Sequence, residues 1–168
     1  LLARHGATVW LRPHPAAEQT VPAGERVRIA RNEDLEELGA TFYELLAAAD
    51  CLVTDYSSIW VDHLLRDVPV LGFCPDLESY RRTRGLALEP YEEWVPGPLR
   101  ARGEDLLAAL ARVLEGADDH AERRRATRSL LVDDARQDPV AATWAAVSRL
   151  AGQRRPAAPR GSRAGSAP

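Results

Sequence analysis

The sequence predicts an α/β fold of the doubly wound type, built around a parallel sheet. Short apolar runs, typical of strands buried inside such a sheet, alternate with segments of helical periodicity. Strands and helices that alternate in this way need crossover connections, and these join parallel neighbours. At 168 residues and 45% hydrophobic content, the chain can bury one substantial core. We therefore expect one domain over residues 1–150, followed by a tail.

Three strands are predicted in the first third of the chain. The opening residues, LLARHG, are typical of the last turn of a helix that Gly6 ends. The apolar run at 9–11 is stopped by two prolines, so it predicts a strand that leads into a loop. A second short strand is predicted at 27–30. Apolar side chains three and four positions apart predict one helix over 34–49, and the apolar run at 51–54 predicts a strand buried on both faces.

The alternation continues through the rest of the chain. Residues 59–66 have helical spacing that Pro69 ends, and the run at 68–74 predicts another buried strand. Residues 75–103 are interpreted as a long connection with two Pro-Gly signals. The remaining helices are predicted at 104–115, at about 119–134 and at 139–150. Residues 151–168 are rich in Pro, Gly, Ser and Arg, and we expect a disordered tail there.

Charge and composition exclude several classes of function. The 25 acidic and 22 basic residues give a net charge of −3, which argues against a nucleic-acid binder with a strongly basic field. No apolar run reaches the roughly 18 to 20 residues that a membrane span needs. Cys51 and Cys74 lie in apolar runs without metal-ligand spacing, which indicates buried, reduced thiols and favours a cytoplasmic location. No set of carboxylates and histidines has ligand spacing, so we expect no metal and no cofactor.

The stretch LVTDYSS, residues 52–58, leads from a predicted buried strand into a predicted helix. In an open parallel sheet, ligands bind outside the carboxyl ends of the strands. The hydroxyls of Ser57 and Ser58, with the unpaired amide groups at the start of the helix, suit a phosphate. In the alternative interpretation, Ser58 is only a helix cap and Asp55 only a turn residue. Spacing alone favours neither interpretation.

Two further groups are expected at the same edge of the sheet. His14 lies in RPHP after the first strand, held between two prolines, with Arg12 two residues before it. Because strand ends of one parallel sheet share an edge, His14 and the serine pair are expected to face one crevice. The segment DLESYRRTRG, 76–85, offers Tyr80 and the arginines 81, 82 and 84 as stacking and cationic groups for phosphates. The alternatives are a loop histidine without a specific role and a solvated basic turn.

Three other residues are assigned to packing rather than to a site. His63, on the helix after LVTDYSS, is interpreted as a surface residue or as a core residue with satisfied hydrogen bonds. Tyr91 and Trp94 are interpreted as core or pocket-edge residues.

Several motifs in this order resemble the donor-binding half of the CDP-glycerol glycerophosphotransferases, the teichoic acid and capsule polymer enzymes of the GT-B fold. The motifs are RPHP, ELLAAADCLVTDYSSIWVD, VPVLGF, DLESYRRTRG and PGP. The similarity covers about residues 1–115. It implies a Rossmann-like C-terminal domain that holds a CDP-alcohol. The family moves glycerol phosphate from CDP-glycerol to a hydroxyl of a polyol phosphate polymer or of its lipid-linked primer, and releases CMP.

The resemblance also implies roles for individual residues. Ser57 and Ser58, with the helix amides that follow, would grip the donor phosphates, and His14 would lie at the pyrophosphate as the catalytic candidate. The second-tier substrate contacts would be Arg12, Asp55, Tyr80 and Arg84. Leu86 stands where the family often has an aromatic residue, so the polyol is left open between glycerol, ribitol and other CDP-activated alcohols.

The resemblance further implies a longer protein. The chain contains no Met, and we interpret it as a C-terminal piece that lacks an acceptor domain and the first strand of its own domain. The base that takes the acceptor proton is expected upstream, and the fragment is expected to be inactive alone. The enzyme would be cytoplasmic and would bind peripherally at the inner face of the cell membrane through its N-terminal part. A homo-oligomer is left open.

Three other functions remain as alternatives. The first is a GT-B glycosyltransferase with a nucleotide sugar donor, because such folds bind donors in the same crevice. The second is a serine hydrolase, but the G-x-S-x-G elbow it needs has no counterpart in residues 54–58, which lack glycine. The third is a binding protein that keeps the fold without the chemistry.

Overall fold

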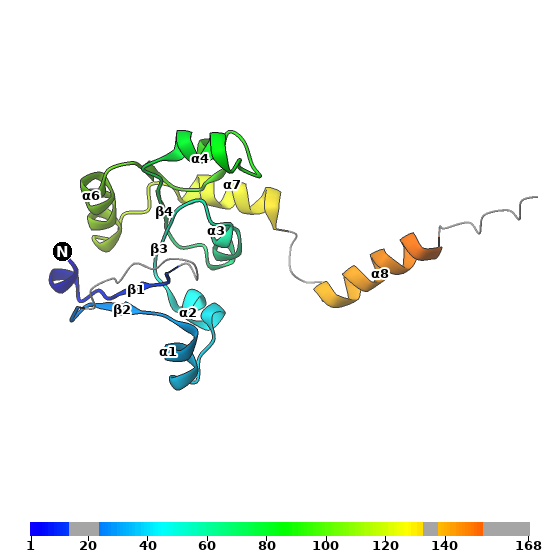
Figure 1. Cartoon of the computed structure of the whole chain (residues 1–168), viewed down its shortest axis with the longest axis horizontal. Coiled ribbons are helices and arrows are strands. Elements are labelled where there is room, and N and C mark those ends of the chain that lie inside the picture. Colours follow the sequence, from blue (N-terminus) through cyan, green and yellow to red (C-terminus); the bar gives the residue numbers. More distant parts are fainter. Residues whose placement is uncertain (14–23, 133–137, 153–168) are drawn as a thin grey trace, which may run out of the picture. The chain divides into compact units, whose positions relative to one another are not determined.

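The computed structural model describes residues 1–13, 24–132 and 138–152. The chain divides into two compact units, Leu1–Val132 and Asp133–Pro168. The first unit contains all strands of the described residues and the candidate site (Figure 1). The second unit contains one described helix.

The strands of the first unit form two parallel sheets. β1 (Val9–Leu11) pairs with β2 (Val27–Ile29). The second sheet has the order β3-β4-β5, and it consists of β3 (Leu52–Thr54), β4 (Val70–Phe73) and β5 (Leu99–Arg100). The predicted α/β class with parallel strands is therefore confirmed.

The prediction of a single sheet is wrong. The backbone groups that flank β1 bond to β2 and its neighbours, as Val9 N–H does to Arg26 O at 2.9 Å and Ala30 N–H does to Leu11 O at 2.8 Å. Leu52 N–H of β3 bonds to Pro69 O, beside β4. Within the described residues no ladder joins β1 to β3, so the two strand ends do not share one continuous edge.

The helix predicted over 34–49 is two helices, α1 (Asn32–Glu37) and α2 (Phe42–Ala48). Gly39 separates them with φ +66°, a left-handed conformation that favours glycine. Thr41 then starts α2 with a capping box: Glu44 N–H donates to Thr41 Oγ1 at 3.2 Å, and Thr41 N–H donates to Glu44 Oε2 at 2.7 Å. The apolar spacing runs across both helices, which is why periodicity alone predicts one.

The predicted helix boundaries hold at several other places. The opening turn is a 3₁₀ helix, η1 (Leu2–His5), and Gly6 ends it with φ +64°. α3 (Ile59–His63) continues as the 3₁₀ turn η2 (Leu64–Arg66), which agrees with the helix predicted over 59–66. The two long helices that follow are α6 (Gly103–Leu114) and α7 (Ala121–Leu131), as predicted.

The predicted long connection at 75–103 is wrong, because it contains three elements. These are α4 (Leu77–Thr83), α5 (Tyr91–Trp94) and β5. Two short helices and a two-residue strand are too short to establish a sequence period, which explains why they were missed. Gly97 lies against β4 so closely that an added Cβ would stand 1.7 Å from Val70 O.

The core of the first unit joins α3, β4 and α5. Its buried residues are Trp60, Leu64, Val70, Cys74, Tyr91 and Val95. Trp94 packs against this cluster, so the packing roles predicted for Tyr91 and Trp94 are confirmed. The segment after α4, which the sequence indicated only as a connection, thus completes the core beneath the end of β3.

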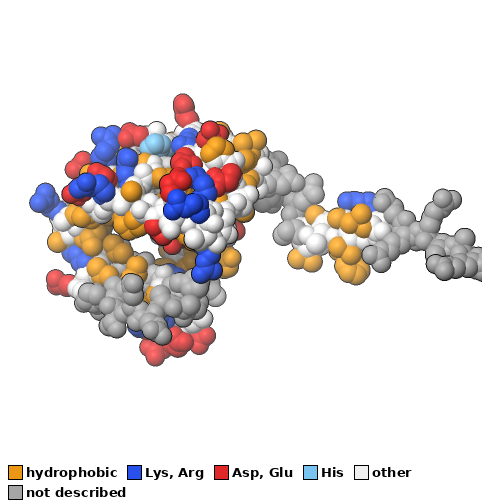
Figure 2. All heavy atoms as spheres, turned by 45° about the horizontal axis from the view of Figure 1, so that its top comes forward, with side chains coloured by type: hydrophobic (Ala, Val, Ile, Leu, Met, Phe, Trp, Pro, Cys, Tyr) orange, Lys and Arg blue, Asp and Glu red, His pale blue; other side chains and the backbone are white. Residues whose placement is uncertain are grey.

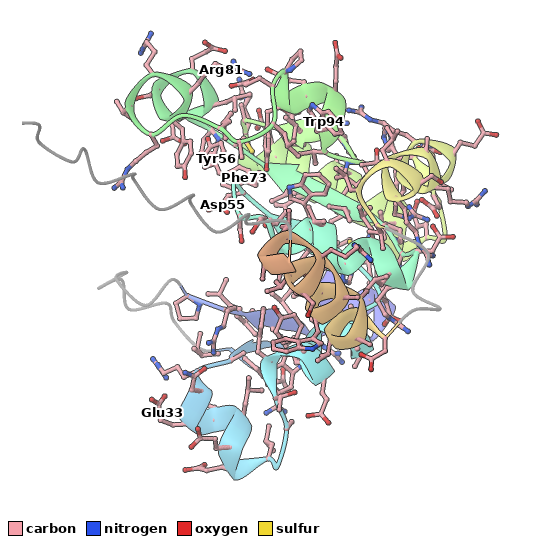
Figure 3. All side chains as sticks on the ribbon, turned by 90° about the vertical axis from the view of Figure 1, so that its right-hand side faces the viewer. Glu33, Asp55, Tyr56, Phe73, Arg81 and Trp94 are labelled. Carbon is pink, nitrogen blue, oxygen red and sulfur yellow. The ribbon has the colours of Figure 1, made fainter. Side chains whose placement is uncertain are left out.

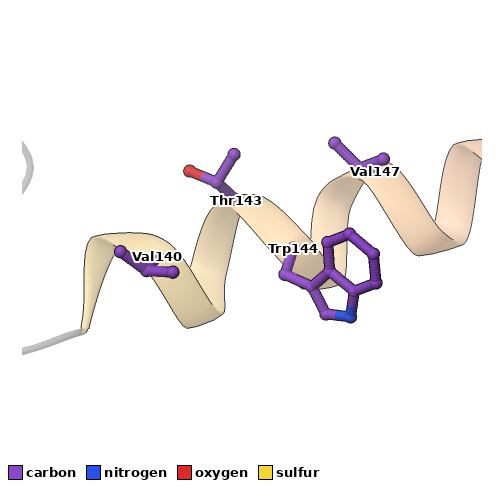
Figure 4. A pocket seen from close by; sticks show the side chains of 4 residues that line it. All are labelled: Val140, Thr143, Trp144 and Val147. Atoms are coloured by element: carbon purple, nitrogen blue, oxygen red, sulfur yellow. The ribbon is translucent and has the colours of Figure 1, made fainter.

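The second unit has the helix predicted at 139–150, observed as α8 (Pro139–Gly152). Figure 4 shows Val140, Thr143, Trp144 and Val147 on this helix. The compact first unit ends at Val132, so the assignment of 139–150 to the donor-binding domain stays a prediction. Of the predicted tail, 153–168 lies outside the described residues. None of the helices in the described part of the chain is both long enough and apolar enough to cross a membrane.

Candidate functional site

The candidate site is the corner Asp55–Ser58, which follows β3 and precedes α3. Ser57 N–H donates to Asp55 Oδ1 at 3.1 Å, and Ile59 N–H donates to Ser57 Oγ at 3.4 Å. Asp55 is therefore a turn residue, and Ser57 rather than Ser58 supplies the oxygen to the first amide of α3. Ser58 is the residue before the helix, and its side chain makes no capping bond. Because Asp55, Ser57 and Ser58 are all exposed, their side chains remain accessible to a ligand.

The end of β4 lies beside this corner, since Thr54 of β3 is paired with Gly72 of β4. Tyr56 OH donates to Asp76 Oδ1 at 2.6 Å, and its ring stacks on that of Tyr80 with centroids 3.9 Å apart. Tyr80, predicted as a site residue, is thus brought to the corner through Tyr56. Asp55, Tyr56 and Phe73 lie close together at this end of the unit in Figure 3.

A third aromatic residue reaches the corner from α5. Tyr91 OH donates to the carbonyl oxygen of Asp55 at 2.7 Å. The sequence analysis did not predict that Tyr56 and Tyr91 support the corner by their contacts. Tyr56 stands inside the DYSS motif, and that position was the available signal. Nothing local marks Tyr91, because its partner is 36 residues away.

Arg81, expected as a cation for phosphates, is neutralised by three carboxylates. It contacts Glu78, and its Nε lies 2.9 Å from Glu89 Oε1 while its Nη2 lies 2.9 Å from Glu92 Oε2. Hydrogen bonds from Arg81 lower the pKa of Glu89. The sequence prediction of a basic patch is therefore wrong for Arg81, whose charge is used to join α4 to α5.

The other arginines of α4 are differently placed. Arg82 and Arg84 are exposed, and neither pairs with a carboxylate of the described residues. Figure 2 shows basic and acidic side chains intermixed on the first unit. Arg84 follows α4 directly and is exposed, and its contact with the donor stays a prediction.

Arg12 lies at the end of β1, in the other sheet. Its Nη1 donates to Ala30 O at 2.7 Å and its Nη2 donates to Asn32 Oδ1 at 2.6 Å. The guanidinium also lies over the Phe42 ring, 5.1 Å from its centroid. Arg12 therefore joins the ends of β1 and β2 to α2, and its substrate contact stays a prediction. His14 lies outside the described residues, so its approach to the serine pair also stays a prediction.

His63 is fully buried, and neither ring nitrogen has a hydrogen-bond partner among the residues that the structure describes. Burial, followed by the charges of Arg66 and Arg124, lowers its pKa to about 4. Of the two interpretations of His63, the core residue is correct, but the hydrogen bonds expected for it are absent among the described residues. It is a core residue that stays neutral because a charge there would be unsolvated beside two cations.

This burial predicts acid sensitivity. Since the pKa of His63 is about 4 when folded and 6.5 as the reference value, the unfolded chain takes up a proton that the folded chain refuses as pH falls below 6.5. We expect this residue to remove about 2 kcal/mol of unfolding free energy between about pH 7 and pH 5. Urea denaturation at both pH values measures it. His63→Phe should lose that part of the pH dependence, and an unchanged pH dependence in this variant would contradict the prediction.

The described residues hold no cluster of three or more His, Cys, Asp or Glu side chains placed for a metal ion. Both cysteines are free thiols. Burial raises the pKa of Cys51 to about 12 and that of Cys74 to about 11, so neither is a nucleophile at neutral pH. Among the described residues, the corner therefore offers hydroxyls, backbone amides and the Asp55 carboxylate.

Comparison with known proteins decides the family. Residues 2–137 match the sequence profile of the CDP-Glycerol:Poly(glycerophosphate) glycerophosphotransferase family. The chain belongs to this family. The match spans the whole first unit from η1 onward, so the glycerophosphotransferase family is shown for both sheets and for the Asp55–Ser58 corner.

The relatives of this chain include enzymes named for ribitol phosphate and enzymes named for glycerol phosphate. It is 42% identical over 59 residues to the teichoic acid ribitol-phosphate primase of Bacillus spizizenii, covering 35% of this chain and 15% of that protein. It is 38% identical over 71 residues to the teichoic acid poly(glycerol phosphate) polymerase of Bacillus subtilis, covering 42% of this chain and 9% of that protein. The chain thus corresponds to a small part of the length of these relatives.

A solved structure supports the fold. The chain superposes on the wall teichoic acid polymerase TagF with a TM-score of 0.50 at 22% identity, covering 76% of this chain and 31% of that one. This similarity confirms the predicted fold class, an α/β fold with parallel sheets like that of TagF.

Proposed function

We propose that the chain is the donor-binding part of an enzyme that transfers glycerol phosphate, or a related polyol phosphate, from a CDP-alcohol to a hydroxyl of a teichoic-acid-like or capsular polymer. The observation that carries this proposal is the family match over residues 2–137, which includes the exposed serine corner after β3. The acceptor would be the growing polymer or a lipid-linked primer. Contact with the inner face of the membrane, through a part of the protein outside this chain, belongs to the same proposal.

In this proposal the Asp55–Ser58 corner holds the diphosphate of the donor. Two exposed hydroxyls, Ser57 and Ser58, hydrogen-bond phosphate oxygens without a lysine. Arg84, which is exposed after the C-terminal end of α4, is proposed to add a cation. Asp55 acts indirectly, because its carboxylate already accepts the Ser57 amide and sets the shape of the turn. Tyr80 supports the turn through its stack on Tyr56.

The reaction would be a phosphoryl transfer. The acceptor hydroxyl oxygen bonds to the phosphorus that carries the polyol, the bond from that phosphorus to the CMP oxygen breaks, and CMP leaves with the electron pair. Positioning and charge stabilisation supply most of the rate in such transfers. His14 is proposed to lie at the pyrophosphate and stabilise the leaving charge. The hydroxyl proton would go to a base in the acceptor domain.

Donor binding tests the proposal. Isothermal titration calorimetry with CDP-glycerol and CDP-ribitol should show binding of at least one of them, and the preferred one identifies the polyol. UDP-glucose and GDP-mannose should not bind. Binding of a nucleotide sugar alone would assign the chain instead to the nucleotide-sugar glycosyltransferases. Release of CMP by the full-length protein, supplied with acceptor polymer, tests the transfer step.

Substitution of the serines tests the site. We expect Ser57→Ala and Ser58→Ala each to weaken binding of the preferred CDP-alcohol by about 10-fold, since each removes a hydrogen bond to a charged oxygen. The matched control is Ser129→Ala on α7, whose hydroxyl bonds only to the Arg125 carbonyl at 3.0 Å among the described residues. The control should bind like the unchanged protein. Equal affinities for all four proteins would place the diphosphate elsewhere.

A further inference from the structure

The corner Asp55–Ser58 is held from behind by α5. Tyr91 is 3% exposed, and its hydroxyl donates to the Asp55 carbonyl at 2.7 Å across 36 residues of sequence. Burial raises the pKa of Tyr91, so the hydroxyl stays protonated and remains a donor. The bond fixes the peptide group between Asp55 and Tyr56, at the start of the turn after β3.

Local hydrogen bonds link the position of the Asp55 peptide to that of Ser57. The carboxylate of Asp55 accepts the Ser57 amide at 3.1 Å, and Ser57 Oγ accepts the Ile59 amide at 3.4 Å. A shift of the Asp55 peptide therefore moves the Ser57 backbone and its hydroxyl together. Because hydrogen bonds to a ligand weaken steeply with poor alignment, small displacements here change ligand binding.

The segment that carries Tyr91 is itself anchored. Tyr91 N–H donates to Glu89 Oε2 at 3.1 Å, and the same carboxyl group binds Arg81 of α4. Arg81 also binds Glu92 within α5, so α4 and α5 are joined by one guanidinium. The ring of Tyr91 lies in the core cluster with Trp60 and Val95. Tyr91 is thus held at its ring by packing and at its backbone amide by the Glu89 carboxylate.

We infer that Tyr91 is a positioning residue, whose hydroxyl sets the geometry of the Ser57 and Ser58 hydroxyls through the Asp55 peptide. The inference rests on the proposed function in one respect, namely that these hydroxyls meet the donor. A purely structural Tyr91 would need only its ring. The hydroxyl and the ring are separated by the variant Tyr91→Phe, which keeps the buried ring and removes only the donor to Asp55.

The experiment compares the unchanged protein with Tyr91→Phe, Ser57→Ala, the double variant and a control variant. Calorimetry with CDP-glycerol or CDP-ribitol measures affinity, and backbone amide hydrogen exchange at 57–59 measures the order of the corner without ligand. We expect Tyr91→Phe to weaken donor binding about 3- to 10-fold and to speed exchange at these amides. In the double variant the two losses should not add, because both act on one hydroxyl. Tyr43→Phe is the matched control, since Tyr43 is 63% exposed on α2, and it should change neither readout.

The outcomes separate the two proposals. If the unchanged protein binds no CDP-alcohol, the proposed function is wrong, and if Ser57→Ala binds as well as the unchanged protein, the proposed contact of Ser57 with the donor is wrong. In both cases faster exchange in Tyr91→Phe still supports control of the corner by the hydroxyl. If Tyr91→Phe leaves exchange at 57–59 unchanged, the inference is overturned. It is also overturned if the affinity losses of Tyr91→Phe and Ser57→Ala add fully, because Tyr91 then acts independently of Ser57.

Discussion

Replacing Gly97 by alanine is expected to lower the free energy of unfolding by about 3 kcal/mol. An added Cβ would stand 1.7 Å from the carbonyl oxygen of Val70 and 2.8 Å from its carbonyl carbon. Both atoms belong to the backbone of β4, which cannot rotate aside as a side chain can. The PGP turn must then move away from the central strand and weaken the contact that brings β5 into the sheet. Urea denaturation followed by circular dichroism measures the loss.

Gly103→Ala is the matched control for this substitution. Gly103 begins α6, and an added Cβ there meets no heavy atom within 4 Å. Its φ is not in the left-handed region, so alanine fits the helix and should be neutral or slightly stabilising. If Gly97→Ala proves as stable as Gly103→Ala, the close packing of the PGP turn on β4 is refuted.

Arg124→Met is expected to cost about 3 kcal/mol of unfolding free energy. Arg124 is 1% exposed, and its guanidinium donates to Asp67 Oδ1 at 2.9 Å, to Asp67 O at 3.0 Å and to both oxygens of Asp118 at 2.8 and 2.7 Å. Asp67 ends η2 with φ +51°, a left-handed conformation that a non-glycine residue rarely adopts. Without the arginine this turn and two partly buried carboxylates lose their partner, although part-exposure of the carboxylates limits the cost.

Arg125→Met provides the comparison, because it removes the neighbouring arginine from the same carboxylate. The Nε of Arg125 lies 3.3 Å from Asp67 Oδ2, and its side chain is 61% exposed. Exposed ion pairs contribute little, so this variant should lose less than about 1 kcal/mol. Equal losses in the two variants would show that burial of Arg124 has no energetic consequence. Arg124 also lowers the pKa of Asp118, and nuclear magnetic resonance titration should find that pKa higher in Arg124→Met.

Much of the architecture follows from short sequence patterns. The apolar runs predict β1 to β4 with small errors at their ends, and helical spacing predicts α3, α6, α7 and α8. Two predictions failed, the single helix over 34–49 and the long connection over 75–103. A local signal for the first was present in the sequence, and none was present for the second. Gly39 and the Thr41–Glu44 capping box mark the break between α1 and α2, whereas nothing in 75–103 has the length that a period needs.

The candidate site divides in the same way. Asp55, Ser57 and Ser58 could be proposed as a ligand corner from the sequence alone. Polar residues directly after a buried strand are a local pattern, and ligands bind at such strand ends in a parallel sheet. Arg81 was misassigned, since its three carboxylate partners extend from Glu78 to Glu92 and meet only after α4 and α5 fold. For His63 the sequence left surface and core open, because helical spacing does not say which face of α3 becomes buried.

The sequence by itself determined the alternation of strands and helices, the family and the serine corner. These depend on residues a few positions apart, whose hydrogen bonds and apolar spacing act within one element. Only the tertiary structure decided that β1 and β3 lie in separate sheets, that Tyr91 supports Asp55 and that Arg124 is buried on Asp67. These three features depend on which distant segments of the chain pack together and exclude water. Burial and long-range hydrogen bonds determine their energies, and no local sequence pattern encodes them.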